Sequence, residues 1–206
     1  MQLSNSSTNL DMQITQDDLY NTIQVFQNYG KQVKRYAKAN LAQRGKKGQL
    51  HQSIDYDVNL DGSNVSVSIV INPPADDYWA YVESGVAGSE KKLPNVGKNN
   101  DVLDLPDFKF KGKNIAEGVI ESWIKKKGIR GRVNKKWKSA GNRGGQFITD
   151  KSFAFLIGRS IAKRGLPWTG FLSQPILTQN QNLTNDLLDA FGTDIIKKLD
   201  FEFKVK

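Results

Sequence analysis

The chain has 206 residues, the usual length of one domain or of one domain with a sizeable insertion. Its hydrophobic fraction of 38% can form a packed core but lies below the roughly 45–50% of an average globular chain, so we expect part of the length to be solvated loop or insertion. The chain has no cysteine, which excludes disulfides, thiolate nucleophiles and thiolate-bound metals. A membrane-spanning helix needs about 20 apolar residues in a row, and every apolar stretch of this chain is much shorter.

The formal net charge of +9 is concentrated in one part of the sequence. Residues 107–151 contain 13 basic and 4 acidic residues, whereas the remainder contains 17 of each and is neutral. A single positive block in a neutral body indicates a surface that faces an anionic partner. A solvated lysine-rich loop is an equally good interpretation of the same block.

The N-terminal part is expected to be a polar arm followed by a long helix. Residues 1–14 are rich in Ser, Asn and Gln, so we expect a flexible arm. They lack the basic and apolar regions of a signal peptide, so none is expected. A capping pattern begins at Thr15, and apolar residues at helical spacing predict a helix to about Leu41. Gly30 interrupts this helix at a cost of about 1 kcal/mol relative to alanine.

A β-hairpin is predicted directly after this helix. Apolar residues alternate with polar ones over 54–58 and again over 65–71, and Asp61-Gly62 provides a turn between the two runs. Pro73-Pro74 ends the second strand. Residues 76–85 are expected to form one or two helical turns.

The second half alternates excursions and helices. Residues 88–106 are polar and unpatterned, and 128–145 form a basic loop with five glycines. The spacing predicts a short helix over 115–124, with Trp123 in the core, and another that begins at Thr149 or Asp150 and ends before Gly165.

The C-terminal part is predicted to contain a last helix and a final strand. Apolar residues at helical spacing from Leu183 to Ile195 predict the helix. Strict alternation of apolar residues from Leu199 to Val205 predicts a strand that pairs with the hairpin.

The expected fold class is α+β: a small antiparallel sheet covered by a long N-terminal helix and by C-terminal helices. We expect one domain over 15–206, interrupted by a basic mid-chain insertion at about 88–150.

The sequence predicts no catalytic residue, no metal site and no cofactor, and therefore no enzyme. His51, Ser53 and Asp55 fall on the same face of the first predicted strand, where they would stand in a row and not converge as a triad does. Asp55 and Asp57 could serve a metal-dependent nuclease, but a further acidic residue and a lysine at matched spacing are missing. The metal-dependent nuclease remains as a third hypothesis.

The basic block carries aromatic residues and could bind nucleic acid. Trp137 lies between two lysines and is expected to be exposed, so that it could stack on bases. The block would equally well contact an acidic protein surface or line the inner wall of a DNA channel. The cations expected to contact an anionic partner are Lys125, Lys126, Lys127, Arg130, Arg132, Lys135, Lys136 and Lys138.

Three segments follow the long predicted N-terminal helix in this order: Gly48–Ile54, Tyr78–Gly85 and Leu166–Leu172. In their order and spacing they resemble the tail-completion or head–tail joining proteins of tailed bacteriophages. The chain departs from the family pattern in the third segment, where Gly170 precedes Phe171 and Ser173 replaces the usual basic residue.

The resemblance implies a ring-forming structural subunit of the virion neck that connects the portal or connector to the tail, assembled in the bacterial host cytoplasm. It implies a homo-oligomeric ring with heterologous contacts, neighbouring neck, portal or tail proteins, possible contact of the basic segment with packaged DNA, and no membrane. A nucleic-acid-binding accessory protein that uses residues 107–151 is the alternative.

The resemblance also assigns interface residues. Tyr78, Trp79, Glu83 and Gly85 would place the neck contacts, and Trp168, Phe171 and Leu172 would pack the last helix. Plain core packing is the competing interpretation of Trp79, Trp168 and Phe171, because large aromatic side chains usually lie in the core.

Overall fold

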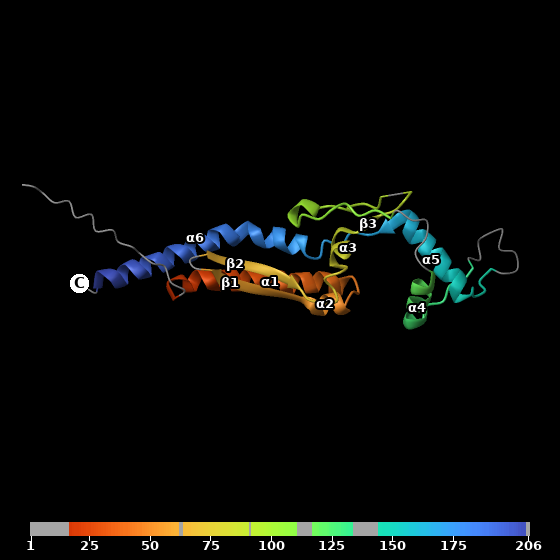
Figure 1. Ribbon diagram of the computed structural model, residues 1–206, viewed down its shortest axis with the longest axis horizontal. Coiled ribbons are helices and arrows are strands. Elements are labelled where there is room, and N and C mark those ends of the chain that lie inside the picture. Colours follow the sequence, from red (N-terminus) through yellow and green to blue (C-terminus); the bar gives the residue numbers. More distant parts are fainter. Residues whose placement is uncertain (1–16, 62–63, 91, 111–116, 134–143, 205–206) are drawn as a thin grey trace, which may run out of the picture. The chain divides into compact units, whose positions relative to one another are not determined.

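The computed structural model describes residues 17–61, 64–90, 92–110, 117–133 and 144–204 (Figure 1). The chain packs as two compact units. The outer unit contains the residues up to Asn72 together with Pro175–Lys206, and the inserted unit is Pro73–Gln174. One domain over 15–206 stays a prediction, because the packing of the chain into two units does not tell whether they fold together or separately.

The outer unit combines two long helices with a β-hairpin, which confirms the α+β fold class. The predicted first helix is confirmed, although Thr15 lies outside the described residues. The elements are η1 (Asp17–Leu19), α1 (Tyr20–Gln43), α2 (Gln49–Ser53), β1 (Ile54–Asp61), β2 (Asn64–Ile71) and α6 (Ser173–Lys204), whose first two residues belong to the inserted unit.

The hairpin separates an apolar face from a polar one, as its alternation predicts. Tyr56 pairs with Ile69 and Val58 with Val67 on a half-buried face. Asp55, Asp57 and their neighbours on the opposite face are exposed. Because α1 packs against both strands, the apolar face is covered mainly by this helix (Figure 1).

Gly30 allows the hairpin to approach α1 closely. A Cβ atom at this position would lie 2.8 Å from Cγ of Tyr56, so the aromatic ring occupies the space that any other residue would need. Glycine lowers the intrinsic helix propensity of α1. The packing of the Tyr56 ring explains why Gly30 is nevertheless found in the middle of this helix.

A buried carboxylate of α6 caps the N-terminus of α1. Asp194 Oδ1 accepts hydrogen bonds from the backbone nitrogen of Asn21 (3.1 Å) and from its Nδ2 (2.6 Å). Asp194 Oδ2 accepts from the backbone nitrogen of Thr22 (2.9 Å) and from its Oγ1 (2.8 Å). These backbone groups belong to the first helical turn, which has no partners inside the helix. Burial raises the pKa of Asp194, but the hydrogen bonds from Thr22 and Asn21 outweigh it and hold the pKa below its usual value.

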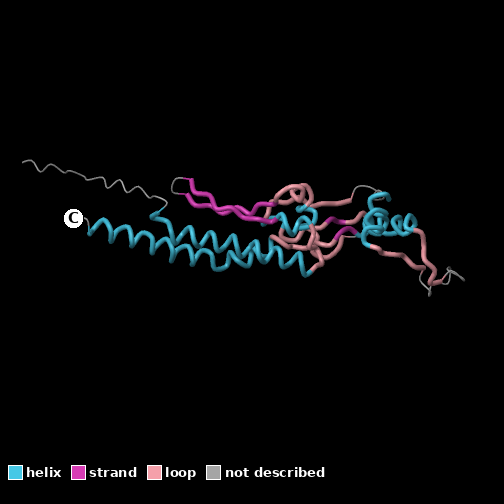
Figure 2. Tube along the Cα trace, turned by 90° about the horizontal axis from the view of Figure 1, so that it is seen from below, coloured by secondary structure: helices cyan, strands magenta, loops and turns pink. Residues whose placement is uncertain are grey.

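The same pair of helices is joined again about two turns further along α1. The hydroxyl of Tyr29 donates to Oδ1 of Asn180 at 2.6 Å. Because Asn21 and Thr22 meet Asp194 whereas Tyr29 meets Asn180, α1 and α6 run side by side in opposite directions (Figure 2).

The inserted unit contains two short strands and two packed helices. Val86 pairs with Leu166 between β3 and β4, and α4 packs on α5 through Ile120, Ile124 and Ala154. The helix predicted to begin at Thr149 or Asp150 is confirmed, with Thr149 as its cap. The elements are α3 (Trp79–Ser84), β3 (Val86–Ala87), η2 (Asn100–Val102), α4 (Glu117–Lys127), α5 (Asp150–Arg164) and β4 (Gly165–Leu166).

The predicted final strand from Leu199 to Val205 is wrong. The last helix begins at Ser173, ten residues before the predicted Leu183, and continues to Lys204. The sequence contains no glycine or proline after Gly192, so nothing interrupts the helix. The short apolar alternation is therefore overridden by continuation of a helix that is already formed.

The prediction that Trp123 lies in the core is also wrong. Its side chain is 45% exposed, whereas Ile120 and Ile124 are buried. These two isoleucines lie one helical turn apart and occupy the face of α4 that packs on α5. Trp123 lies about 80° around the helix from the middle of that face.

No helix in the described parts of the chain is long and apolar enough to span a membrane.

Replacing the capping carboxylate should destabilise the outer unit. Asp194 is 4% exposed, and in Asp194→Asn an amide group would face N–H donors. We expect a loss of about 1–3 kcal/mol in the free energy of unfolding, measured by urea denaturation near neutral pH. Asp186→Asn, at an exposed position of the same helix, is the matched control and should change little.

The pH dependence provides a second readout of the same variant. The folded pKa of Asp194 lies below its usual value, so the carboxylate stabilises the protein fully above the unfolded pKa of about 3.9. This contribution is lost as the pH falls through the folded pKa. The difference between the wild type and Asp194→Asn should therefore shrink in acid, and a difference that stays constant would contradict the assignment.

Candidate interaction site around Glu83

Two segments that the sequence analysis selected come together in the inserted unit. Glu83 lies near the end of α3 and is 2% exposed. Its Oε2 accepts a hydrogen bond from the backbone nitrogen of Leu172 at 2.8 Å. Its Oε1 accepts from the backbone nitrogen of Ser173 at 3.2 Å and from Ser173 Oγ. Because α6 begins at Ser173, the Glu83 carboxylate caps the N-terminus of this helix.

The backbone of α3 binds the residues that precede this cap. Thr169 and Gly170 both donate their N–H groups to the carbonyl of Glu83 at 3.1 Å. The hydroxyl of Thr169 donates to the carbonyl of Val82 at 2.5 Å. Main chain and side chain of Glu83 thus hold the whole turn from 169 to 173, and Thr169 and Ser173 are fully buried with it.

Gly85 makes the close approach between these segments possible. Its backbone has φ 71° and ψ −179°, a conformation that is essentially restricted to glycine. A Cβ atom here would lie 2.6 Å from the backbone nitrogen of Trp168 and 2.8 Å from the carbonyl oxygen of Leu166. Gly85 therefore ends α3 and lets β3 begin immediately beside β4.

The aromatic residues of the two segments differ in burial. Phe171 and Trp168 are buried, together with Leu172, as the core-packing interpretation expects. Tyr78 and Trp79 are half-buried. The amine of Lys98 lies 5.8 Å from the Trp168 ring, within the range of a cation–π contact. The role of these residues as an interface stays a prediction.

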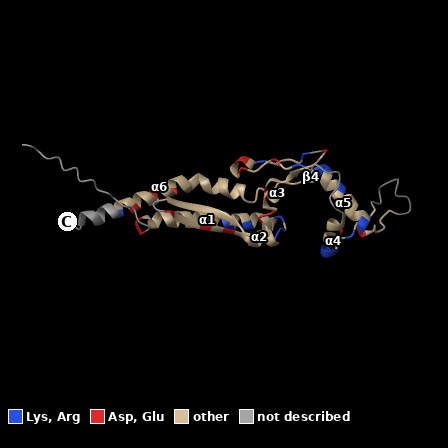
Figure 3. Ribbon diagram, viewed as in Figure 1, with Lys and Arg blue, Asp and Glu red and all other residues tan. Residues whose placement is uncertain are grey.

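The basic segment is described in part. The side chains of Lys125, Lys126 and Lys127 are exposed at the end of α4. Their charges interact favourably with the negative end of the helix dipole. Lys125 Nζ also lies 2.8 Å from Glu121 Oε1 in an ion pair. Figure 3 marks basic residues in blue at the end of α4 and along α5. Lys135, Lys136, Trp137 and Lys138 lie outside the described residues.

Two arginines of this segment contact an exposed aromatic ring. The guanidinium carbon of Arg132 lies 4.1 Å from the ring centroid of Phe147, and that of Arg130 lies 5.7 Å from it. The backbones of Arg132 and Phe147 also form an isolated antiparallel bridge. Phe147 is 53% exposed, so the described part of the basic segment combines charge with apolar surface.

The prediction that His51, Ser53 and Asp55 share a strand face is wrong. His51 and Ser53 lie in α2, which begins after Gly48, and only Asp55 lies in β1. The hydroxyl of Ser53 donates to the carbonyl of Leu50 at 3.0 Å, as in a helical turn. Strand pairing starts only at Ile54, because the apolar alternation does not extend further back.

Asp55 is engaged in an ion pair. Lys34 Nζ lies 2.8 Å from Asp55 Oδ1, and this hydrogen bond, with that from the backbone of Tyr56, lowers the pKa of the carboxyl. Asp57 is exposed on the same face of the hairpin, as predicted. Within the described ranges, no group of three or more His, Cys, Asp or Glu residues is arranged to hold a metal ion.

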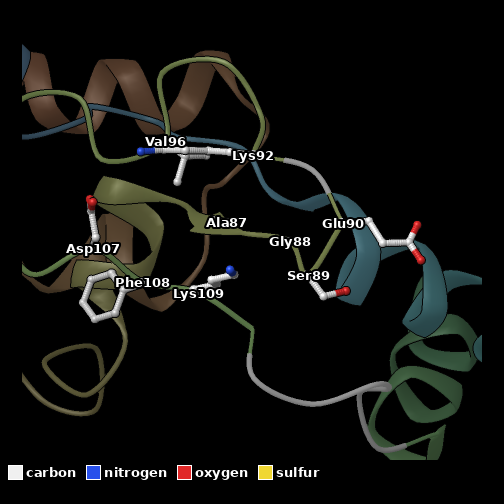
Figure 4. Close-up of a pocket in the computed structure, with 9 residues that line it drawn as sticks. All are labelled: Ala87, Gly88, Ser89, Glu90, Lys92, Val96, Asp107, Phe108 and Lys109. Carbon is white, nitrogen blue, oxygen red and sulfur yellow. The ribbon is translucent and has the colours of Figure 1, made fainter.

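A pocket of about 360 Å³ lies beside β3 in the inserted unit. Its charged side chains point in different directions, with Lys109 directed toward the strand and Glu90 directed away from the other labelled residues (Figure 4). Glu90 also pairs with Lys163. The lining residues are Ala87, Gly88, Ser89, Glu90, Lys92, Val96, Asp107, Phe108 and Lys109. This arrangement does not converge on a common point, so it defines no specific ligand.

Sequence reasoning missed the roles of Asp194 and Ser173. Asp194 lies on the same face of α6 as Leu183, Leu187 and Ala190. An acidic residue on an otherwise apolar helix face indicates a buried polar contact. Ser173 stands where the resembled family has a basic residue, and its hydroxyl donates to Glu83. The local sequence contains no signal for that contact, because the two residues are 90 positions apart.

Comparisons of the chain with protein-family models, with curated proteins and with solved structures found no match. The likeness to phage neck proteins therefore remains a resemblance of three segments. Two of these segments, Tyr78–Gly85 and Leu166–Leu172, contact each other through Glu83 and Gly85.

The Glu83→Gln variant should destabilise the protein. The amide would keep one acceptor and would place an NH₂ group against the N–H donors of Leu172 and Ser173. We expect a loss of about 2–3 kcal/mol in the free energy of unfolding, measured by urea denaturation. Glu90→Gln, at an exposed position, is the control. Equal effects of the two substitutions would refute the capping role.

The Gly85→Ala variant tests the close approach to Trp168. Gly128→Ala is the matched control, because Gly128 also has a positive φ of 64° but no atom lies within 4 Å of its added Cβ. We expect Gly85→Ala to cost at least about 2 kcal/mol more than Gly128→Ala, measured as the difference in free energy of unfolding. Similar losses in both variants would mean that backbone strain alone accounts for the effect.

Proposed function

We propose that the protein is a structural subunit of a tailed-bacteriophage virion, a head–tail joining or tail-completion protein that assembles as a ring between the portal and the tail. The three resembling segments motivate this proposal. The observation that carries it is a row of exposed apolar side chains along α6.

Apolar residues lie on more than one side of helix α6. One side carries Leu183, Leu187 and Ala190 and is partly or fully buried, with Asp194 in the same row. On other sides, large apolar residues remain exposed, and Leu188 is 66% exposed. They are Leu177, Leu188, Phe191, Ile195 and Ile196. Leu188, Phe191 and Ile195 follow one another at helical spacing on one side of α6. Neighbouring exposed apolar side chains of this kind favour a protein interaction site, as an assembly subunit requires.

The charge distribution supports the same role. The inserted unit contains 19 basic and 10 acidic residues, whereas the rest of the chain contains 11 of each. Neutral outer units can associate with one another without strong electrostatic repulsion. The basic inserted unit is then available for an anionic neighbour such as packaged DNA, with phosphate contacts that do not read sequence.

A substitution on α6 tests the proposal in phage particles. We expect Leu188→Glu to fold with a free energy of unfolding within about 0.5 kcal/mol of the wild type but to be absent from particles, because it places a charge on the apolar row. Asn182→Asp, which adds the same charge at an exposed position on another side of the helix, should be incorporated normally. Mass spectrometry of purified particles and gold-labelled antibodies give the readout, with label expected at the junction of head and tail.

The alternative is a nucleic-acid-binding accessory protein, favoured by the concentration of the net charge of +9 in residues 73–174. Absence of the wild-type protein from particles would overturn the structural role. DNA affinity that falls steeply with salt would then support the alternative.

A further inference from the structure

The strand β2 has one edge that no other strand pairs with among the described residues. The sheet contains β1 and β2 in this part of the chain, and its register joins only these two strands. In an antiparallel pair, alternate residues turn their N–H and C=O groups outward, so the other side of β2 presents a row of backbone donors and acceptors. The eight residues of β2 include no proline and no charge, so this edge favours a further strand. We call it the free edge of β2.

The hairpin and α6 lie on adjacent sides of α1. Gly30 of α1 contacts the hairpin through Tyr56, whereas Tyr29 binds Asn180 of α6. Successive helical residues are about 100° apart, so the two contacts lie roughly at right angles around α1. In Figure 1, β2 lies between β1 and α6, and Figure 2 shows the hairpin on one side of the two helices. A strand added to the free edge would therefore lie over α6.

The exposed apolar row of α6 faces the side on which such a strand would lie. Its members Leu188, Phe191 and Ile195 are about 100° around the helix from Leu183 and Asp194, which face α1. Because α1 and α6 are right-handed and antiparallel, this rotation turns the exposed row toward the side on which the hairpin covers α1. The free edge of β2 and the exposed row therefore adjoin each other.

The tip of the hairpin is level with the start of α1. The strand β1 runs antiparallel to α1, because Gly30 contacts Tyr56 whereas Lys34, one helical turn later, pairs with Asp55. From Tyr56 the strand continues about 17 Å to its end, and from Gly30 the helix extends about 15 Å back to its start. The chain that precedes α1 therefore enters beside the hairpin tip.

This preceding chain contains a short alternating segment. Residues 1–16 lie outside the described part, and the Ser- and Asn-rich composition is confined to 4–9. Leu10, Met12 and Ile14 alternate with polar residues, which is the pattern of a strand with one apolar face. Two residues then remain to connect this segment to Asp17 at the start of η1. The other alternating segment, from Leu199 onward, is helical as far as Lys204 and belongs to α6.

Direction, length and charge fit residues 10–14 to the free edge of β2. A segment that turns back at the hairpin tip runs opposite to β2, which is the direction of antiparallel pairing. Five strand residues span about 13 Å, and the row from Leu188 to Ile195 spans about 10 Å of α6. On its exposed face, β2 carries no charge that would repel Asp11, whereas β1 carries Asp55 and Asp57.

We infer that residues 10–14 pair with the free edge of β2 as a third strand and cover the exposed apolar row of α6 in the isolated subunit. The three apolar side chains of the segment lie on Leu188, Phe191 and Ile195. A neighbouring subunit must displace the segment before it can bind this row, so the segment restrains assembly. The covering of the row is independent of the proposed function, whereas the restraint on assembly rests on it.

Engineered disulfides in the full chain test where the segment lies, because the natural chain contains no cysteine. Under mild oxidation, Met12→Cys with Leu188→Cys should form an intramolecular disulfide at least about tenfold faster than Gln13→Cys with Leu188→Cys. Position 13 lies on the opposite face of the strand and points away from α6. Met12→Cys with Asp186→Cys, on another side of α6, is the second control and should be as slow.

Two results of the disulfide experiment would overturn the inference. Equal rates for the Met12 and Gln13 pairs would mean that the segment does not lie on α6 as a strand. Disulfides that join two chains, in place of the intramolecular one, would assign the free edge to a second copy of the chain.

A charge in the segment tests the restraint on assembly. Met12→Asp places a carboxylate against the apolar row and should release the segment. We expect it to lower the concentration at which half of the chains self-associate by at least about threefold, measured by analytical ultracentrifugation. Ser6→Asp adds the same charge outside the segment and should behave like the wild type.

Equal self-association of Met12→Asp and Ser6→Asp would overturn the restraint. None of these measurements uses phage particles, so a failure here is distinct from absence of the protein from particles, which would overturn the proposed function.

Discussion

Both long helices begin on a carboxylate that comes from elsewhere in the chain. Glu83 accepts hydrogen bonds at the first residues of α6, and Asp194, on α6 itself, accepts them in the first turn of α1. The residues directly before the two helices are Leu172 and Leu19, whose side chains cannot cap a helix. Each helix start is thus defined by a tertiary contact, and the negative charge also meets the positive end of the helix dipole. Without these two contacts, several buried N–H groups would lose their partners.

This dependence explains what the sequence could and could not predict. The hairpin follows from local signals, the alternation between residues 54 and 71 and the turn-forming residue pair Asp61-Gly62 in the sequence. Helix α5 follows from Thr149 as a local cap. The apolar spacing places the start of α6 ten residues too late, because it takes the first apolar repeat as the beginning of the helix. Ser173 and Pro175 are residues typical of a helix start, but the contact with Glu83 that holds this start is not visible in the local sequence. Local capping rules likewise point to Thr15 for the start of α1 and do not identify Asp194, which lies 172 residues beyond Thr22.

The candidate site was predictable only where family resemblance replaced local rules. Glu83 and Gly85 were selected as members of a motif, but nothing in their own segment indicates that a carboxylate would reach Ser173 or that Trp168 would pass so close to a glycine. Trp123 shows the opposite difficulty. Its helical spacing is compatible with the core, yet Ile120 and Ile124, one helical turn apart, form the face that packs on α5, and Trp123 stays outside it. Hydrophobicity alone does not decide between neighbouring positions of a short helix.

The packing of Tyr56 on Gly30 links two positions that are 26 residues apart in the chain. The ring fills the volume of a missing side chain, so neither residue can change in size alone without opening a void or forcing the hairpin away from α1. Among homologous chains that keep this fold, the two positions should vary together: a larger residue at position 30 should occur with a smaller one at position 56. A helix-weakening glycine would then be maintained by selection on its partner, independently of any role in binding.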